Sequence, residues 1–326
     1  MSELNDKSIV VMGGGTGSYN ILKTLKNYSS DITALVNMID DGGSSGILRD
    51  EQGVLPPGDI RQCLVALSEA PQNIRDLFNY RFRGKGSLYG HSFGNLFLSA
   101  VELSSQDFNQ AIQLAADFLR IKGKVIPITL TNSNLIMTYR GIRYRGETYI
   151  GQVQLKPKES IVLDLDPPAM INDLAQNAIL KSDLIIIAPG DIFRSILPNF
   201  IVKGVKKSLE RSRAKLVVIS NIMNKKTTAE YRVEDYIKLI TSYCGRPVDL
   251  LLVNNKEPSN KQLKKYALLN EYPISYNCNK LDKLARQVVY GNYLNYLSKQ
   301  ENDYVVEKSL IRHNSVKVIE TIKDNI

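Results

Sequence analysis

The segment Ser8-Ile-Val-Val-Met-Gly-Gly-Gly-Thr-Gly17 places a short apolar run directly before a run of glycines. The apolar part is typical of a buried strand, and Ile21, Leu22 and Leu25 then fall on one face of a helix. A second apolar run, Asp31 to Ile39, predicts the next strand. This strand–helix–strand order predicts a parallel sheet with a right-handed crossover.

The same α/β pattern resumes in the second half of the chain. We expect strands at Leu184–Ile187, Leu216–Ile219 and Val248–Val253, and lysine-rich helices over 260–290. The sequence therefore predicts one doubly wound, mostly parallel, Rossmann-like α/β domain over residues 1–326.

Residues 124–165 interrupt this pattern with short strand-like pieces separated by Asn, Gly, Pro and Lys. Lys124–Leu130 and Thr148–Val153 are two of these expected strands. Such spacing predicts a small antiparallel, β-rich insertion at about 124–165.

The composition indicates a soluble globular protein, since 43% of the residues are hydrophobic and 23% are charged. No apolar run approaches the roughly 20 residues that a membrane helix needs, and the polar N-terminus does not resemble a signal peptide. We therefore expect a cytoplasmic protein without a membrane span. Cys63, Cys244 and Cys278 fit neither a zinc pattern nor a disulfide framework and are expected to be reduced thiols.

The net charge of +9 is concentrated in residues 200–290, which hold 18 Lys or Arg against 8 Asp or Glu. Solvated helix faces explain this surplus best, because the lysines lie among helix-like segments without interleaved aromatic residues. The alternative is a surface that binds nucleic acid, whose affinity would fall steeply with salt. We expect no nucleic-acid partner.

The glycine run is the first candidate site, with Gly13, Gly14, Gly15, Thr16 and Gly17 as candidate phosphate-binding residues. It departs from the dinucleotide spacing G-x-G-x-x-G, and it is no P-loop because no Gly-Lys-Ser/Thr follows. Phosphate contact at a helix N-terminus and a merely tight turn both remain open.

The stretch Asp40-Asp41-Gly42-Gly43-Ser44-Ser45-Gly46 follows the second strand. Asp40 and Asp41 could hold Mg2+, and Gly42, Gly43, Ser44 and Ser45 would let a phosphate approach the backbone. A solvated Asp-Asp-Gly turn is the alternative. Because ligands of open sheets lie outside the carboxyl ends of strands, we expect this stretch and the glycine run to share one crevice.

Further polar residues stand at expected helix starts. Asp59 and Arg61 could form a phosphate clamp, or an N-cap with a surface cation. His91, Ser92 and Asn95 could contact a ligand, although Ser92 could also be a plain N-cap. No Ser-His-Asp order can be identified, so nucleophilic catalysis is not indicated.

Together these motifs resemble the CofD/YvcK superfamily, and in particular its YvcK-like gluconeogenesis factor branch. The resemblance rests on six stretches in family order: Gly13–Gly17, Asp40–Gly46, Leu55–Arg61, Tyr80-Arg81-Phe82, Gly90–Asn95 and Pro198-Asn199. Two stretches depart from the family pattern, because Asp191 and Arg194 replace small or hydroxylated residues and Asn224–Thr228 replaces Thr-Gln-Gly-Glu-Thr.

The resemblance implies a ligand cleft and two alternative activities. It would place the glycine run, Asp40, Asp41, Asp59, Arg61, His91, Ser92 and Asn95 around one cleft, covered by a loop that contains Gly190 and Ser195. The YvcK-like branch implies a regulatory protein that binds UDP-N-acetylglucosamine or a dinucleotide such as NAD, without an established reaction. It also implies a role in cell shape and growth on gluconeogenic carbon sources, a cell-wall synthesis or regulatory partner, and a homo-oligomer.

The CofD branch implies a Mg2+-dependent transferase of the 2-phospho-L-lactate transferase type. There Asp40 or Asp41 would hold the metal, and Arg61 with the glycine amides would stabilise phosphate charge. Whether the chain is an enzyme stays open between these two activities.

Overall fold

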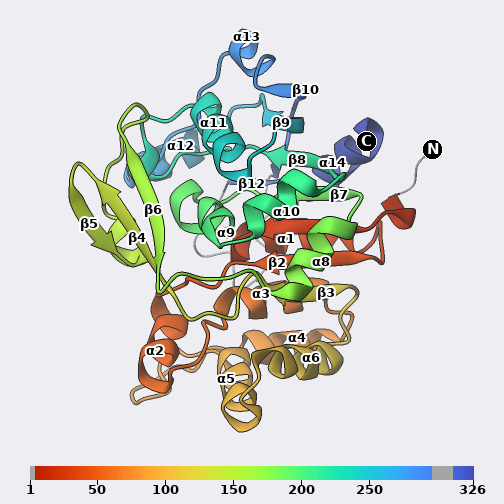
Figure 1. Ribbon diagram of the computed structural model, residues 1–326, viewed down its shortest axis with the longest axis vertical. Helices are drawn as coiled ribbons and strands as arrows, with labels where there is room; N and C mark the ends of the chain where they lie inside the picture. Colours follow the sequence, from red (N-terminus) through yellow and green to blue (C-terminus); the bar gives the residue numbers. More distant parts are fainter. Residues whose placement is uncertain (1–3, 296–310) are drawn as a thin grey trace.

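A parallel sheet of seven strands forms the centre of the molecule in the computed structural model, which describes residues 4–295 and 311–326 (Figure 1). The strands are β1 Ile9–Gly13, β2 Ile32–Val36, β3 Lys124–Pro127, β7 Leu184–Ile187, β8 Lys215–Ile219, β9 Val248–Asn254 and β10 Ala285–Gly291. Their spatial order is β10-β9-β8-β7-β1-β2-β3. This confirms the predicted doubly wound α/β class.

The strand order reverses between β1 and β7, which are neighbours in the sheet although 170 or more residues separate them in sequence. From β1 the chain proceeds to β2 and β3, then returns to β7 and continues outward to β10. Such a switch point leaves a crevice at the carboxyl ends of the two strands, where ligands of this fold class bind.

Helices cover both faces of the sheet, because alternate strand residues point to opposite sides. Ile9 and Val11 pack with α1, α3, α6 and α14, whereas Val10 and Met12 pack with α8, α9, α10 and α11. The helices are α1 Gly15–Leu25, α2 Gly43–Gln52, α3 Gly58–Leu67, α4 Gln72–Asn79, α5 Phe93–Ser105, α6 Phe108–Leu119, α7 Glu147–Ile150, α8 Asp173–Lys181, α9 Leu197–Ile201, α10 Val205–Arg211, α11 Val233–Cys244, α12 Asn260–Ala267, α13 Cys278–Leu281 and α14 Ser315–Asn325.

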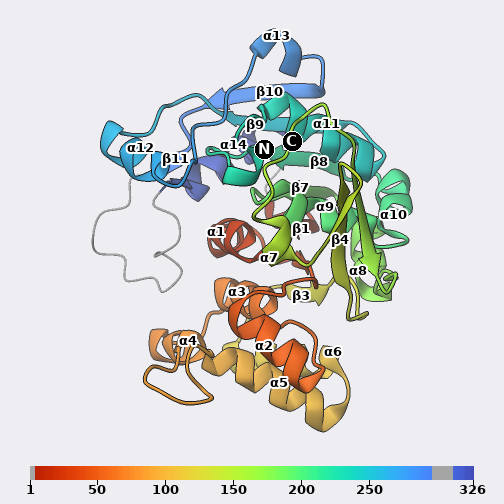
Figure 2. The ribbon, with the colours of Figure 1, turned by 90° about the vertical axis from the view of Figure 1, so that its left-hand side faces the viewer.

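Two small antiparallel sheets complete the described part of the fold. One has three strands, β4 Asn134–Tyr139, β5 Ile142–Arg145 and β6 Ile161–Asp166, and stands beside the main body (Figure 2). The other pairs β11 Leu294–Asn295 with β12 Arg312–His313. Helices α4, α5 and α6 lie together at one end of the molecule in both views. No helix of the described residues is long and apolar enough to cross a membrane.

The structure contradicts three of the secondary-structure predictions. Lys124–Pro127 is not part of the antiparallel insertion, since β3 pairs in parallel with β2. Residues 148–153 hold the end of helix α7 and a turn rather than a strand, because Gly146 and Gly151 bound a single turn. Residues 285–291 form strand β10, where Val288-Val289-Tyr290 follows β propensity and pairs with β9.

Candidate functional site

The glycine run meets two other loops at the switch point. Gly14 is the N-cap of α1, and a Cβ atom placed on it would lie 2.8 Å from Ser195 Cβ and 3.4 Å from Asp59 Oδ2. A Cβ atom on Gly17 would overlap the carbonyl oxygen of Pro189, which follows β7. Only glycine therefore lets the first turn of α1 approach the β7 loop this closely.

The amide end of α1 is occupied by protein groups. The Gly15 N–H donates to the Asp59 carboxylate, and the exposed Thr16 hydroxyl lies 3.5 Å from Gln62 Oε1. A carboxylate at a helix N-terminus is favourable for the same reason as a phosphate. Asp59 thus marks the position where the helix attracts negative charge.

Asp40 connects the second predicted loop to the same place. Its Oδ1 accepts the Gly42 N–H at 3.0 Å, and its carboxylate also accepts a hydrogen bond from Ser45. A Cβ atom on Gly58 would overlap Ser45 Oγ and lie 3.1 Å from Asp40 Oδ2. The carboxyl ends of β1 and β2 therefore both contact the start of α3, as their parallel register requires.

The expected loop at 42–46 is mostly helix, because α2 begins at Gly43. Gly and Ser have low helix propensity, so the local sequence does not predict that a helix begins at Gly43. Burial of Leu48 and Arg49 and the Asp40 contacts at the first turn stabilise the helix instead.

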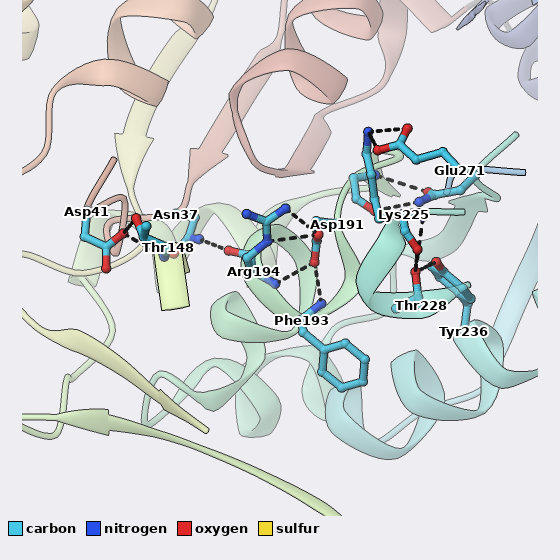
Figure 3. A network of polar contacts seen from close by, with 12 residues as sticks. Asn37, Asp41, Thr148, Asp191, Phe193, Arg194, Lys225, Thr228, Tyr236 and Glu271 are labelled. Atoms are coloured by element: carbon cyan, nitrogen blue, oxygen red, sulfur yellow. Dashed lines mark hydrogen bonds and ion pairs between the residues drawn. The ribbon is translucent and has the colours of Figure 1, made fainter. Parts of the chain in front are cut away.

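Asp41 binds the antiparallel insertion through Thr148. Its Oδ1 accepts from Thr148 N at 3.2 Å and from Thr148 Oγ1 at 3.0 Å (Figure 3). Gly146 has a φ of +90°, and a Cβ atom there would overlap Asp41 Oδ2. These contacts dock α7 over the end of β2, a position that nothing in the local sequence indicated.

Docking of α7 brings a third carboxylate, Glu147, toward Asp40 and Asp59. Burial raises the pKa of Glu147 well above its usual range, and repulsion from Asp40 and Asp59 raises it further. Burial also raises the pKa of Asp40. The pKa of Asp59 rises to about 7, through burial first and then repulsion from Asp40. All three side chains are half-buried, and their mutual repulsion shows that they form one acidic cluster.

Arg194 follows β7 and lies close enough to Glu147 and Asp41 to interact with their charges. It lies in a π-helical turn, Ile192–Ile196, and Asp191 Oδ2 accepts from its Nε at 3.0 Å and its Nη2 at 2.8 Å (Figure 3). Asn37, at the tip of β2, donates to the Arg194 carbonyl at 3.1 Å. Attraction from Asp191, Glu147 and Asp41 outweighs burial and raises the pKa of Arg194. The two departing residues of this first stretch, Asp191 and Arg194, thus form one ion pair.

His91, Ser92 and Asn95 are buried, and their contacts connect α2, α3 and α5. The Ser44 hydroxyl lies 3.0 Å from His91 Nδ1 and accepts from Asn95 Nδ2 at 3.0 Å. Arg61 Nε donates to Asn95 Oδ1 at 2.9 Å. Ser92 accepts the Asn95 N–H and is the N-cap of α5. In the free protein these side chains bind one another; their contact with a ligand stays a prediction.

The outer loops of the site are also held by hydrogen bonds. Gly190 exchanges two hydrogen bonds with Asn221, at 3.2 and 2.7 Å. In the second departing stretch, Lys225 Nζ pairs with Glu271 at 3.0 Å and Thr228 Oγ1 lies 2.9 Å from the Tyr236 hydroxyl (Figure 3).

The donor set suits a hard cation, although no ready metal site exists. Within residues 4–295 and 311–326, no group of three or more His, Cys, Asp or Glu side chains is arranged to hold a metal ion. Mg2+ typically uses one or two carboxylates together with phosphate oxygens and water. Asp40, Asp41 and Asp59 each accept hydrogen bonds from the protein, so that the Mg2+ role predicted for Asp40 and Asp41 stays a prediction.

A cavity of about 1,010 Å³ lies elsewhere, at the opposite edge of the sheet. Its lining includes Ser8, Asp31 and Lys124, at the amino ends of β1, β2 and β3, and it runs between α6 and α8. Its size alone would suggest a ligand-binding site, but none of the predicted site residues lines this groove.

Comparisons with known proteins agree with the fold and the motif order. The family model described as 2-phospho-L-lactate transferase CofD matches residues 9–294. A gluconeogenesis factor of Bacillus subtilis is 33% identical over 97% of this chain and 97% of its own length. That of Halalkalibacterium halodurans is 35% identical over 98% of this chain and 96% of its own. A crystal structure of a UPF0052 family member from Bacillus halodurans superposes with a TM-score of 0.88 at 34% identity, over 97% of this chain and 99% of that one.

Proposed function

Because this chain belongs to the CofD family and groups there with the gluconeogenesis factors, we propose that it binds a nucleotide sugar or dinucleotide as a regulatory ligand. UDP-N-acetylglucosamine and NAD are the two ligands that we name. The regulated process would be cell-shape maintenance and growth on gluconeogenic carbon sources, through a cell-wall synthesis or regulatory partner.

One observation carries the proposal: the first turn of α1, the Asp40 loop and Ser195 meet at the switch point of the sheet. A helix N-terminus with close backbone approach favours a diphosphate. Ser195 adds a hydroxyl beside Gly14, and Asp59 can release the Gly15 N–H to a ligand oxygen.

Calorimetric titration with UDP-N-acetylglucosamine and NAD tests this proposal. Gly15→Val fills the space at the α1 terminus, and Ser195→Ala removes the hydroxyl beside Gly14. The matched control is Ser104→Ala, because Ser104 is exposed on α5, away from the switch point. We expect binding in wild type and the control, and weaker binding in both site variants. No heat with either ligand in wild type would refute the proposal.

The second candidate function is a Mg2+-dependent transferase acting on a nucleotide diphosphate donor, favoured by the three facing carboxylates Asp40, Asp59 and Glu147. Bound Mg2+ would neutralise phosphate charge during transfer. Asp40 and Asp59 would hold it, Arg194 would stabilise charge on the transferred group, and α7 would exclude water. Metal-dependent release of a nucleoside monophosphate, with the phospho group passing to an added alcohol acceptor and the reaction lost in Asp40→Asn, would favour this candidate. A donor that stays intact with Mg2+ and that acceptor would exclude it.

A further inference from the structure

The turn after α12 presents two leucines to solvent at the periphery of the molecule (Figure 2). Leu268 is 85% exposed, the highest value among the large hydrophobic side chains of the described residues, and Leu269 is 62% exposed. The turn is ordered, because the N–H groups of Leu269 and Glu271 donate to the Tyr266 carbonyl at 2.9 and 3.1 Å. A single exposed leucine is ordinary, but two adjacent ones on an ordered turn indicate a surface that another apolar phase covers.

The opposite face of α12 is fixed to the protein. The cluster beneath it consists of Ile222, Met223, Tyr266, Leu294 and Ile311, with Leu263 packed against it. The Tyr266 hydroxyl also accepts the Ile311 N–H at 3.0 Å. Because this face is buried, the other face of the helix must lie toward solvent. The exposure of the leucines is therefore a property of the packed helix and its turn.

Three lysines share the exposed face with Leu268. Lys261, Lys264 and Lys265 stand seven, four and three positions before it, which are the spacings of one helix face. All three are exposed, and within the described ranges none of them forms an ion pair. Residues 256–272 hold four lysines but only two acids, one of which is already engaged in an ion pair. The face thus combines unneutralised positive charge with protruding apolar side chains.

This combination is complementary to an anionic lipid surface. Apolar side chains of peripheral proteins enter the boundary between headgroups and acyl chains, and neighbouring lysines reach the lipid phosphates through their flexible stems. A stable protein–protein interface engages about 20–30 residues on each partner, far more than one short helix and its turn present. The charge and the small size of the surface therefore favour a bilayer over a protein partner.

We propose that the exposed face of α12 and the turn at Leu268 and Leu269 dock on a bilayer that contains anionic lipids. The two leucines enter the interface, and the three lysines contact headgroup phosphates. Two leucines and three lysines hold a protein reversibly, unlike a membrane-spanning helix. This inference goes beyond the proposed ligand and shares none of the candidate phosphate-binding residues, so each can fail without the other.

The first test compares Leu268→Ser with Leu114→Ser, a matched control that removes an exposed leucine from α6. Binding is measured by cosedimentation with vesicles of phosphatidylcholine and phosphatidylglycerol in equal parts, and with vesicles of phosphatidylcholine alone. Wild type should bind the anionic vesicles far more tightly than the neutral ones, and added salt should weaken this binding. Loss of one inserted leucine should weaken it about tenfold in Leu268→Ser, with no change in Leu114→Ser.

The second test concerns the charged part of the surface. Lys264→Gln should weaken binding to the anionic vesicles about fivefold, because one cation near the headgroups is lost. Lys207→Gln, which removes an exposed lysine from α10, should bind as wild type does. All four substituted side chains are exposed, so the thermal midpoints of the variants should equal that of wild type.

Each contrary outcome overturns the proposal. Wild type that does not sediment with anionic vesicles would do so, as would equal binding by wild type and Leu268→Ser. Weaker binding accompanied by a lowered thermal midpoint would assign Leu268 a structural role instead. Equal binding to both kinds of vesicle would remove the role of the lysines. Binding of poly-glutamate without binding of vesicles would assign the surface to an acidic protein partner.

Discussion

Replacing Asp59 with asparagine should change how the stability of the protein depends on pH. The ordinary pKa of this carboxyl is 3.8, and in the folded protein burial and Asp40 raise it to about 7. Between these values the folded protein keeps a proton that the unfolded chain has released. The free energy of unfolding therefore falls as pH rises through this window, and Asp59→Asn, which has no proton to lose, should escape that fall.

The magnitude follows from the same pKa difference. One pH unit of difference corresponds to about 1.4 kcal/mol, and the range from pH 5 to about 7 covers two units. This gives an upper limit of about 3 kcal/mol. Partial solvent access of the side chain reduces it, so Asp59→Asn should gain about 2 kcal/mol relative to wild type between pH 5 and pH 8.

Urea unfolding in EDTA at pH 5, 6, 7 and 8 measures this effect. The readout is the difference in the free energy of unfolding between variant and wild type. This difference cancels the contribution of His313, whose pKa burial lowers to about 4 and whose effect on stability is opposite to that of Asp59 in both proteins. Asp50→Asn, at an exposed carboxylate of α2, is the control and should show a flat difference. A flat difference in Asp59→Asn as well would refute the raised pKa of the buried Asp59 carboxyl.

Three further variants test other contacts of the fold. Gly17→Ala should destabilise the protein by about 2 kcal/mol or more, measured by urea unfolding, because its methyl group overlaps the Pro189 carbonyl; wild-type stability would contradict the close packing. Thr148→Val should cost about 1–2 kcal/mol and increase proteolysis around residues 146–151, since Asp41 loses the Oγ1 hydrogen bond; unchanged cleavage would argue against docking by Asp41. Wild type should lose free energy of unfolding as pH falls from about 6.5 to about 4, because the unfolded chain gains a proton on His313 first. His313→Gln should lack this loss in urea unfolding at acid pH. An unchanged dependence of its unfolding free energy on pH would exclude His313 as the cause.

The sequence predicted β1, β2, β7, β8 and β9 of the central sheet, but not β3 and β10, because the predicted strands are short, nearly continuous apolar runs buried on both faces. Ile9–Gly13 and Leu184–Ile187 are buried throughout. The convergence of β1 and β2 at one edge followed from their parallel direction alone. These predictions needed only local patterns and the handedness of crossovers.

The candidate site at the carboxyl edge of the sheet depends on contacts between residues that are far apart in sequence. Asp41 and Thr148 are 107 positions apart, and the single turn that contains Glu147 reads locally as a strand. Such pairings require tertiary structure, which periodicity cannot supply.

The groove between α6 and α8 has a practical consequence for ligand discovery. Its roughly 1,010 Å³ lies at the amino edge of the sheet, whereas the proposed diphosphate position is at the carboxyl edge. A small molecule that fits this groove would leave the proposed nucleotide position unoccupied. Displacement of UDP-N-acetylglucosamine or NAD is therefore the criterion that separates occupants of the two edges.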